Sequence, residues 1–211
     1  MPRPARVSRD RLLAAAAAEF ADRGFAGARV DRIARRARVN KAMIYYHFHS
    51  KQELYRTLLR RVFTEAAERM QAIAAGPGPS PDKINRVVST FADFIRAHDF
   101  FPAIMLREVA ERGAHLDPET LGALVSVPRA FFAIMKDGAA EGALRPVHPI
   151  VAYFSMVAPI VFYLAAGPIR QEVTARHLLN LTALAPEEFV SQLQDSLHRA
   201  LVQESARRTR S

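Results

Sequence analysis

The sequence feature that most restricts the fold is the stretch 30–51, VDRIARRARVNKAMIYYHFHSK. Its first half repeats apolar residues at helical spacing, at Val30, Ile33, Ala34 and Ala37. Residues 38–39 leave room only for a turn. Asn40 is a strong N-cap for a second helix, because its side-chain oxygen can accept a free backbone N–H. Ile44 and Phe48 lie four residues apart on that helix and face inward. The pattern predicts a helix-turn-helix.

The outer surface of the second helix carries cations, phenols and small side chains: Lys41, Ala42, Met43, Tyr45, Tyr46 and His47. The major groove of DNA accepts such a helix with its N-terminal residues toward the base edges. We therefore expect residues 41–43 to contact bases. Phosphates, which position a protein without reading sequence, are the expected partners of Tyr45, Tyr46, His47, Arg29 and Lys51. Asn40, at the helix start, completes the predicted DNA-binding set. The alternative for Tyr45 is packing against the first helix.

Residues 37–51, ARVNKAMIYYHFHSK, resemble the DNA-binding signature of the tetracycline-repressor (TetR) family. That signature usually reads Ala-Gly-Val-Ser-Lys-Gly-x-Leu-Tyr-x-His-Phe-x-x-Lys. The positions that match by type and spacing are Ala37, Val39, Lys41, Tyr45, His47, Phe48 and Lys51. Two positions depart from it. Arg38 stands where the family has Gly, so a non-Gly residue would occupy a turn conformation that Gly tolerates better. Ala42 replaces a Gly near the bases, which should alter sequence preference more than fold.

The charge is concentrated on the same segment. Residues 1–51 carry 12 Lys and Arg against 4 Asp and Glu, whereas residues 52–211 carry 18 against 17. A basic head on a nearly neutral body is the distribution expected of a protein that binds a polyanion. The alternative is a solvated basic face without a partner, which the helix-turn-helix pattern disfavours.

The composition sets further limits. Half of the 211 residues are apolar, which is enough for a sizeable core, and there is no cysteine. The sequence therefore excludes a disulfide framework, a thiolate nucleophile and a Cys-ligated metal. The N-terminal residues MPRPARVSRD contain no apolar segment typical of a signal peptide, and we expect the protein to be cytoplasmic.

The rest of the chain has helical periodicity and no period-two strand pattern. We expect helices over about 8–23, 51–74, 81–99, 102–112, 118–141 and 186–207, with a kink at Pro128. The Gly and Pro residues of 76–81 predict a loop. The predicted fold class is all-α, with a three-helix DNA-binding head at 1–51 that begins with a basic arm (1–7). The first turns of the connecting helix, to about residue 66, can be counted with the head. The helical body spans 52–211, and the TetR resemblance implies that it binds an effector and dimerises.

The run 150–166 requires separate treatment because only Ser155 and Pro159 interrupt 17 otherwise apolar residues. A membrane-spanning helix needs about 20 apolar residues, and this run is shorter and contains a proline. A helix that is apolar on all sides can equally be buried in a protein core, and we favour this second interpretation.

The TetR resemblance implies how the body works. In that family a small molecule enters a pocket in each body, the connecting helix swings, and the heads separate from the operator spacing. The last two body helices form a four-helix dimer interface. The pocket candidates are Phe91, Phe94, His98, Phe101, Met105, Phe131, Met135, Tyr153, Met156 and Tyr163. The dimer-interface candidates are Phe154, Val161, Phe189, Leu193, Leu197 and Leu201. For both sets the alternative is ordinary intrachain core.

A search for chemistry finds no phosphate-binding loop, nucleophile elbow or metalloprotease pattern. We interpret Glu108 and Glu111, with Arg107 and Arg112 nearby, as solvated ion pairs. The scattered histidines are interpreted as surface residues or satisfied core residues. The sequence thus predicts no catalytic site, no metal and no cofactor.

Together these features predict a bacterial, cytoplasmic, homodimeric transcriptional regulator that binds palindromic double-stranded DNA. The resemblance implies a repressor released by a small hydrophobic effector, with no membrane association. Two alternatives remain open. A ligand-binding protein or enzyme with an accessory helix-turn-helix is disfavoured by the missing catalytic residues. A nonspecific DNA-binding protein is disfavoured by the nearly neutral, apolar body.

Overall fold

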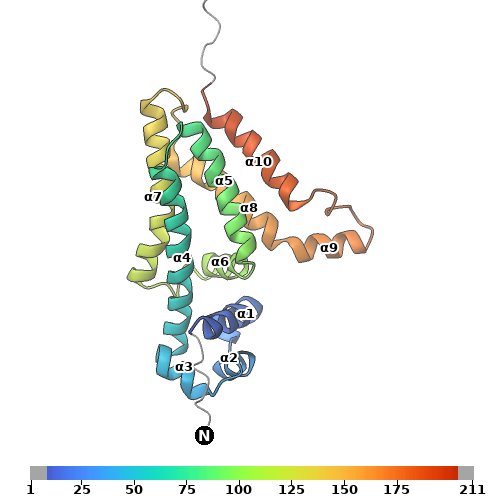
Figure 1. The fold of residues 1–211 in the computed structure, drawn as a ribbon. Helices are drawn as coiled ribbons and strands as arrows, with labels where there is room; N and C mark the ends of the chain where they lie inside the picture. Colours follow the sequence, from blue (N-terminus) through green and yellow to red (C-terminus); the bar gives the residue numbers. More distant parts are fainter. Residues whose placement is uncertain (1–8, 204–211) are drawn as a thin grey trace, which may run out of the picture. The chain divides into compact units, whose positions relative to one another are not determined.

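The computed structural model describes residues 9–203, and within them the fold is all-helical, as predicted (Figure 1). The first helices are α1 (Arg9–Gly27), α2 (Val30–Ala37), α3 (Lys41–Phe48), α4 (Lys51–Ala75) and α5 (Ser80–Ala97). The remaining ones are α6 (Phe101–Ala110), α7 (Pro118–Ala140), α8 (Pro149–Ala165), α9 (Gly167–Ala175) and α10 (Pro186–Leu201). The expected basic arm, the first residue of the first expected helix and the end of the last expected helix lie outside the described residues.

The chain forms two compact units. The first unit contains the chain up to Phe63 together with Asp99–Leu124, and the second contains Thr64–His98 together with Val125 onward. Helices α4 and α7 each contribute to both units. The first unit therefore includes the helix-turn-helix, α6 and the beginning of α7.

The core of the first unit is built from the apolar faces that the sequence predicted. Helix α1 buries its stripe of Leu12, Leu13, Ala16 and Phe20. Helix α2 buries Val30, Ile33, Ala34 and Ala37, and α3 buries Ile44 and Phe48. Removing a large apolar side chain from water stabilises a fold by about 1.5–3 kcal/mol. The two short helices are therefore held by packing more than by their own helix propensity.

Gly24 interrupts α1, as the sequence predicted for the end of the first helix. Its backbone has φ 66° and ψ 177°, a conformation that a residue with a side chain rarely adopts. A Cβ at this position would also lie 3.2 Å from Arg107 Nη1. Gly24 thus allows the bend near the end of α1 and leaves space for the side chain of Arg107 on α6.

The core of the second unit is formed by α5, α7, α8 and α10. Helix α10 packs on both α5 and α8 (Figure 1). The buried apolar side chains of α5 and α8 include Val87, Phe91, Ala152, Met156 and Ile160. Near the end of α10, Leu144 pairs with Val202 in an isolated antiparallel bridge, the one β contact within the described residues.

Three of the predicted dimer-interface residues prove to be intrachain core. Leu197, Leu201 and Val161 are only 5%, 2% and 9% exposed within a single chain. Phe189 and Leu193 are half-buried, and Phe154 is exposed. These three side chains are covered within their own chain, and an apolar stripe on α10 does not by itself reveal whether its own chain or a second chain covers it.

Helix α9 was not predicted. It follows α8 after a single residue and begins with Gly167 and Pro168, and none of its residues is buried. Without an apolar stripe the segment has no helical signal in the sequence. No single helix among residues 9–203 is long and apolar enough to cross a membrane, and α8 and α9 pass such a test only as a pair bent by 49°.

Candidate nucleic-acid interface

The turn between α2 and α3 has the geometry that its sequence requires. Arg38 lies in the left-handed region with φ 53° and ψ 50°, which confirms that a non-Gly residue occupies the turn conformation. The N–H groups of Arg38 and Val39 donate to the carbonyls of Arg35 and Ala34, each at 3.0 Å. These bonds satisfy the free end of α2 and direct the chain immediately into α3.

Asn40 begins α3 as the predicted N-cap. Its side-chain Oδ1 accepts from the backbone N–H of Ala42 at 2.9 Å, and its carbonyl accepts from the N–H of Met43 at 2.9 Å. An Asn cap of this kind stabilises a helix by about 1 kcal/mol. The cap fixes the first turn of α3, which carries the three predicted base-contacting residues.

Helix α3 presents two distinct faces. Ile44 and Phe48 are completely buried against the head, and Tyr45 and Tyr46 are 43% and 75% exposed. Lys41 and Ala42 are also exposed, whereas Met43 and His47 are half-buried at the edges. The rings of Tyr46 and His47 meet edge to face at 5.2 Å. The exposed face therefore combines a cation, a methyl group and two phenols.

Lys41 and Asp31 form an exposed ion pair across the two helices, with Lys41 Nζ 2.9 Å from Asp31 Oδ1. Their hydrogen bond lowers the pKa of Asp31 and raises the pKa of Lys41. Both groups thus remain charged at neutral pH. This carboxylate holds the ammonium of Lys41 at the start of α3.

Lys51 is an expected phosphate contact, and in the structure its ammonium group lies against the backbone at the end of α1. Lys51 Nζ donates to the carbonyl oxygens of Phe25 at 2.8 Å and Ala28 at 3.2 Å. It also lies over the Phe25 ring, 4.5 Å from the centroid. These carbonyls follow the bend at Gly24, so Lys51 fastens the start of α4 to the end of α1.

Arg29 occupies the N-cap position of α2 and its side chain is exposed, as an expected phosphate contact should be. Its backbone N–H donates to Glu19 Oε1 at 3.1 Å, and the same oxygen accepts from Arg32 Nε. Glu19 is only 5% exposed. Sequence reasoning missed this brace, although an acid at helical spacing on the apolar stripe of α1 was a signal for it.

Comparison with known proteins finds two family models that match successive parts of the chain. Residues 12–58 match the model of bacterial regulatory proteins of the tetR family, and residues 81–195 match the tetracyclin repressor-like C-terminal domain. The chain belongs to the tetR family. It is a helix-turn-helix transcriptional regulator and not an enzyme.

Among its tetR-family relatives is the transcriptional repressor SCO4008 of Streptomyces coelicolor, 27% identical over 92% of this chain and 93% of the relative. The ketosteroid regulator KstR2 of Mycobacterium tuberculosis shares the fold with a TM-score of 0.71 and 20% identity, over 94% of this chain and 98% of its own. FadR of Bacillus subtilis, solved in complex with stearoyl-CoA, has a TM-score of 0.63 and 17% identity, over 88% and 97%.

The ten predicted pocket residues are divided between the two units. Phe101 and Met105 belong to the first unit, and the other eight belong to the second. Phe131 and Tyr153 lie near each other, with ring centroids 5.9 Å apart. Tyr163 instead stacks on Phe189 at 3.9 Å. One hollow of about 330 Å³ on the second unit is lined by other residues, Asn85, Gln194, Asp195 and His198.

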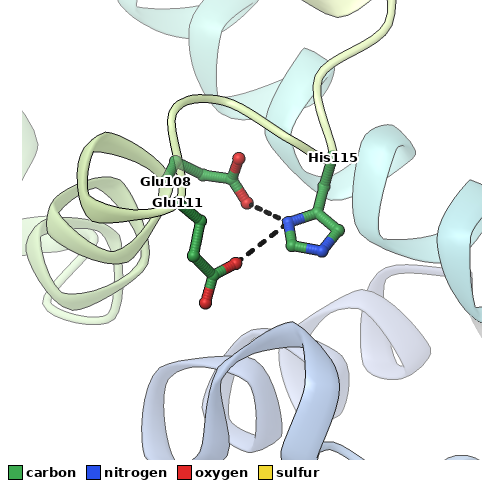
Figure 2. A group of neighbouring side chains, drawn as sticks. All are labelled: Glu108, Glu111 and His115. Carbon is green, nitrogen blue, oxygen red and sulfur yellow. Dashed lines mark hydrogen bonds and ion pairs between the residues drawn. The ribbon is translucent and has the colours of Figure 1, made fainter.

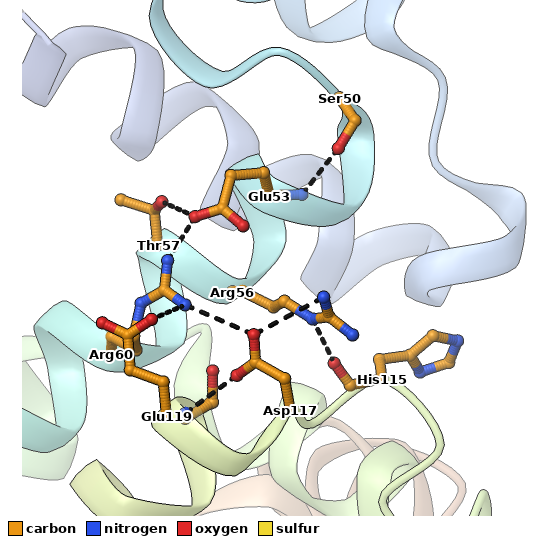
Figure 3. Close-up of polar contacts among 9 residues, drawn as sticks. Ser50, Glu53, Arg56, Thr57, Arg60, His115, Asp117 and Glu119 are labelled. Atoms are coloured by element: carbon orange, nitrogen blue, oxygen red, sulfur yellow. Dashed lines mark hydrogen bonds and ion pairs between the residues drawn. The ribbon is translucent and has the colours of Figure 1, made fainter.

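In the first unit, α4 is joined to the turn between α6 and α7 by a polar network (Figure 3). Arg56 Nε donates to the carbonyl of His115 at 3.1 Å, and Arg56 and Arg60 each lie 3.5 Å from Asp117. Asp117 in turn accepts from the backbone N–H of Thr120 at 2.9 Å and so caps α7. Hydrogen bonding from Thr120 lowers the pKa of Asp117, and the two arginines add to this shift.

The interpretation of Glu108 as a solvated ion-pair residue was wrong. Glu108 is 2% exposed, and its Oε1 accepts from Tyr55 Oη at 2.6 Å and lies 2.9 Å from His115 Nδ1 (Figure 2). Burial, above all, and the hydrogen bond to Glu108 raise the pKa of Tyr55. The sequence could not reveal this contact because Tyr55, on α4, is far from α6 in the chain.

Proposed function

We propose that this protein is a cytoplasmic, homodimeric repressor that binds a palindromic operator and is released by a small hydrophobic effector. The observation that carries the proposal is the exposed face of α3, fixed in place by the Asn40 cap and by the burial of Ile44 and Phe48. A relative of similar length, SCO4008, is described as a repressor. An operator-binding protein works where the chromosome lies, which is the reason for assigning the cytoplasm.

Within α3 we assign the first turn to base reading and the later residues to phosphates. Ala42 and Met43 cannot donate hydrogen bonds from their side chains, so their selectivity has to come from apolar contact, for which the thymine methyl is suited. Lys41 can reach guanine O6 or N7 once it leaves Asp31. Tyr46, at 75% exposed, and Arg29 are the strongest candidates for phosphate contacts.

The first prediction separates these roles by selecting binding sites from a random duplex pool. Met43→Ala should change the preferred base at one position per half-site and leave nonspecific affinity nearly unchanged. A wrong base at a position that is read typically costs about 1–3 kcal/mol. Tyr46→Phe removes only a hydroxyl and should weaken all sequences equally. If Met43→Ala selects the wild-type site and Tyr46→Phe selects a new one, the two faces of α3 are assigned the wrong way round.

The homodimer is supported by an exposed apolar face on α8. Val151, Phe154 and Phe162 lie three and eight residues apart and are 58%, 59% and 65% exposed. These steps place them along one side of the helix. Large apolar side chains that gather on one exposed face mark an interaction site, and a palindromic operator requires a twofold-symmetric partner, which a second copy of this chain provides.

The hydrophobic character of the effector is supported by the composition of the second unit. Phe91, Phe131, Met135 and Met156 are at most 4% exposed, and burial raises the pKa of Tyr153, close to Phe131, to about 12. Two proteins of the same fold point the same way: FadR was solved in complex with stearoyl-CoA, which carries a long apolar acyl chain, and KstR2 is described as a ketosteroid transcriptional regulator. An effector need only prefer the state that does not bind DNA.

The second prediction tests the effector class with stearoyl-CoA and a ketosteroid as probes and free coenzyme A as the matched control. At least one probe should raise the unfolding temperature and weaken operator binding about 5–150-fold, the usual range of coupling between two sites. Free coenzyme A should do neither. Release by free coenzyme A alone would show that the effector is polar.

A further inference from the structure

Two carboxylates and one imidazole converge at the end of α6, within the first unit. Glu108 lies in the last turns of α6, Glu111 caps it, and His115 follows in the turn to α7. Arg112 and Gly113 both have positive φ, 58° and 70°, and reverse the chain so that the His115 ring faces back toward α6. Figure 2 shows both carboxylates directed at the same ring nitrogen.

The spacing of the three groups fits ligands around one metal ion. His115 Nδ1 lies 2.9 Å from Glu108 Oε1 and 3.3 Å from Glu111 Oε2, and the three atoms are all within 4.8 Å of one another. Zinc binds imidazole nitrogen and carboxylate oxygen at about 2.0–2.2 Å. Two such ligands at angles of about 90–109° are then roughly 2.9–3.5 Å apart.

The burial of Glu108 points independently to a missing cation. Its carboxylate is 2% exposed, and its Oε2 is buried without a hydrogen-bond partner among the described residues. No Lys or Arg within residues 9–203 forms an ion pair with it. An imidazolium at His115 would neutralise the buried carboxylate of Glu108 but not that of Glu111, which is 43% exposed. A divalent ion with a neutral imidazole balances both.

We propose that Glu108, Glu111 and His115 bind a divalent transition-metal ion of the zinc class. Imidazole favours this class over Mg²⁺ and Ca²⁺, which prefer oxygen ligands alone. Tyr55 Oη, which donates to Glu108 Oε1, supplies the kind of outer hydrogen bond that orients a metal-binding carboxylate. Metal binding requires His115 to carry its proton on Nε2, so that Nδ1 is free to coordinate.

The site would join α6 to the helices that carry the DNA-binding head. The centroid of the His115 ring lies 4.1 Å from that of the Phe25 ring. The backbone carbonyl of His115 accepts a hydrogen bond from Arg56 on α4. A metal at Nδ1 would hold this ring, and with it the contact to the end of α1. Because linkage is reciprocal, an ion that prefers this arrangement changes operator affinity by the same factor by which DNA changes the affinity for the ion.

The test uses the full-length protein without a histidine tag, stripped of metal with a chelator. Calorimetric titration with ZnCl₂ should give one site per chain. Co²⁺ should give visible absorption bands from a site with nitrogen and oxygen ligands. Glu111→Gln, at an exposed position, and His115→Asn should each weaken Zn²⁺ binding at least tenfold and abolish the Co²⁺ bands. Glu172→Gln on α9 and His49→Asn on the head are the matched controls and should bind as the wild type does.

Three results would overturn the proposal. One is the absence of stoichiometric binding at micromolar Zn²⁺. Another is binding that persists in both Glu111→Gln and His115→Asn, which would place the ion elsewhere. The third is stoichiometric binding of Mg²⁺ or Ca²⁺ in preference to Zn²⁺. Circular dichroism of Glu111→Gln distinguishes loss of the site from loss of the fold, because this side chain is 43% exposed.

Discussion

At the scale of single residues, Lys41 and Lys51 show how the same side chain serves two purposes ten positions apart. Both match the family signature. Lys41 is exposed on α3 and paired with an exposed carboxylate, whereas Lys51 donates to two backbone carbonyls of the α1 bend. Charge and spacing in the sequence cannot separate these roles, because both residues follow the pattern equally well.

The third prediction follows from this difference. Lys41→Ala should make the dependence of log affinity on log salt shallower by about 0.9 for each phosphate that the variant no longer neutralises. Lys51→Ala should leave that slope nearly unchanged and lower the unfolding temperature of the head, because hydrogen bonds from a charged donor contribute about 1.5–3 kcal/mol. Both variants remove one positive charge, so each controls for the other. Equal slopes for the two variants would support the phosphate contact expected of Lys51.

Arg38 occupies a strained backbone conformation at a position where the family signature has Gly. The left-handed conformation costs a residue with a Cβ about 1 kcal/mol more than it costs Gly. The side chain is exposed beside the helix-turn-helix. We infer that the arginine adds a further positive charge on the DNA-binding side, at the expense of strain in the turn between α2 and α3.

At the scale of helices, the sequence was most informative where one face is apolar. The expected spans of α4, α5, α6 and α7 agree with the structure to within about two residues, because their apolar residues recur every three or four positions. The span of α8 agrees as closely, from an apolar run without such a face. Helix α9 has no such stripe and could not be found. The exposed face of α3 was also predictable, because Ile44 and Phe48 define the buried side and leave the rest outside.

What could not be predicted depends on contacts between distant segments. The burial of Glu108 requires Tyr55 from α4 and the reversal of the chain at Arg112. The burial of Leu197 and Leu201 requires α5 and α8 to cover α10. Helical periodicity gives the direction of a face on its own helix and carries no information about which element lies against it.

The fourth prediction concerns Tyr153 on α8, whose pKa burial raises to about 12. In the unfolded chain a tyrosine ionises near pH 10. The neutral form is therefore favoured in the fold, so this contribution to stability is complete below pH 10 and is lost as the pH rises toward 12. Tyr153→Phe should flatten the decline of the unfolding temperature over this range.

The exposed Tyr46 on α3 provides the control, because Tyr46→Phe removes the same hydroxyl without changing a buried group. Its alkaline decline should match that of the wild type. Part of the decline should remain in Tyr153→Phe, since the pKa of Tyr55 is also raised. A wild-type unfolding temperature that is constant between pH 9 and 11 would contradict the assignment.

At the scale of the whole molecule, the two units differ in what they leave exposed. The first unit exposes cations and phenols on α3 and a few apolar side chains such as Val109 on α6, whereas the second exposes more large apolar side chains, on α8 and after it. Besides the α8 face, Ile169, Leu178 and Leu179 are 68%, 72% and 63% exposed. Water contact over so many large apolar groups is unfavourable, so we expect a second copy of the chain to cover this surface.

The fifth prediction tests this dimer by placing a carboxylate at three positions: on the exposed face of α8, on the exposed surface of α6 and in the core of the second unit. Phe154→Asp, on the exposed α8 face, should give folded monomers in sedimentation, because a carboxylate buried in an apolar interface is costly. Val109→Asp, at a position on α6 that is 72% exposed, should remain dimeric. Leu197→Asp should unfold the second unit, since this residue is 5% exposed within its own chain.

Operator binding then reports on the same interface through the DNA-binding heads. In a dimer, the second head binds at an effective concentration set by the first, of order millimolar for a short connection. Phe154→Asp removes this advantage although every residue of α3 is unchanged. Its operator affinity should approach that of one half-site, and Val109→Asp should keep the wild-type affinity. A Phe154→Asp protein that sediments as a dimer would move the interface away from α8, and a wild type that is monomeric at micromolar concentration would exclude the twofold assembly.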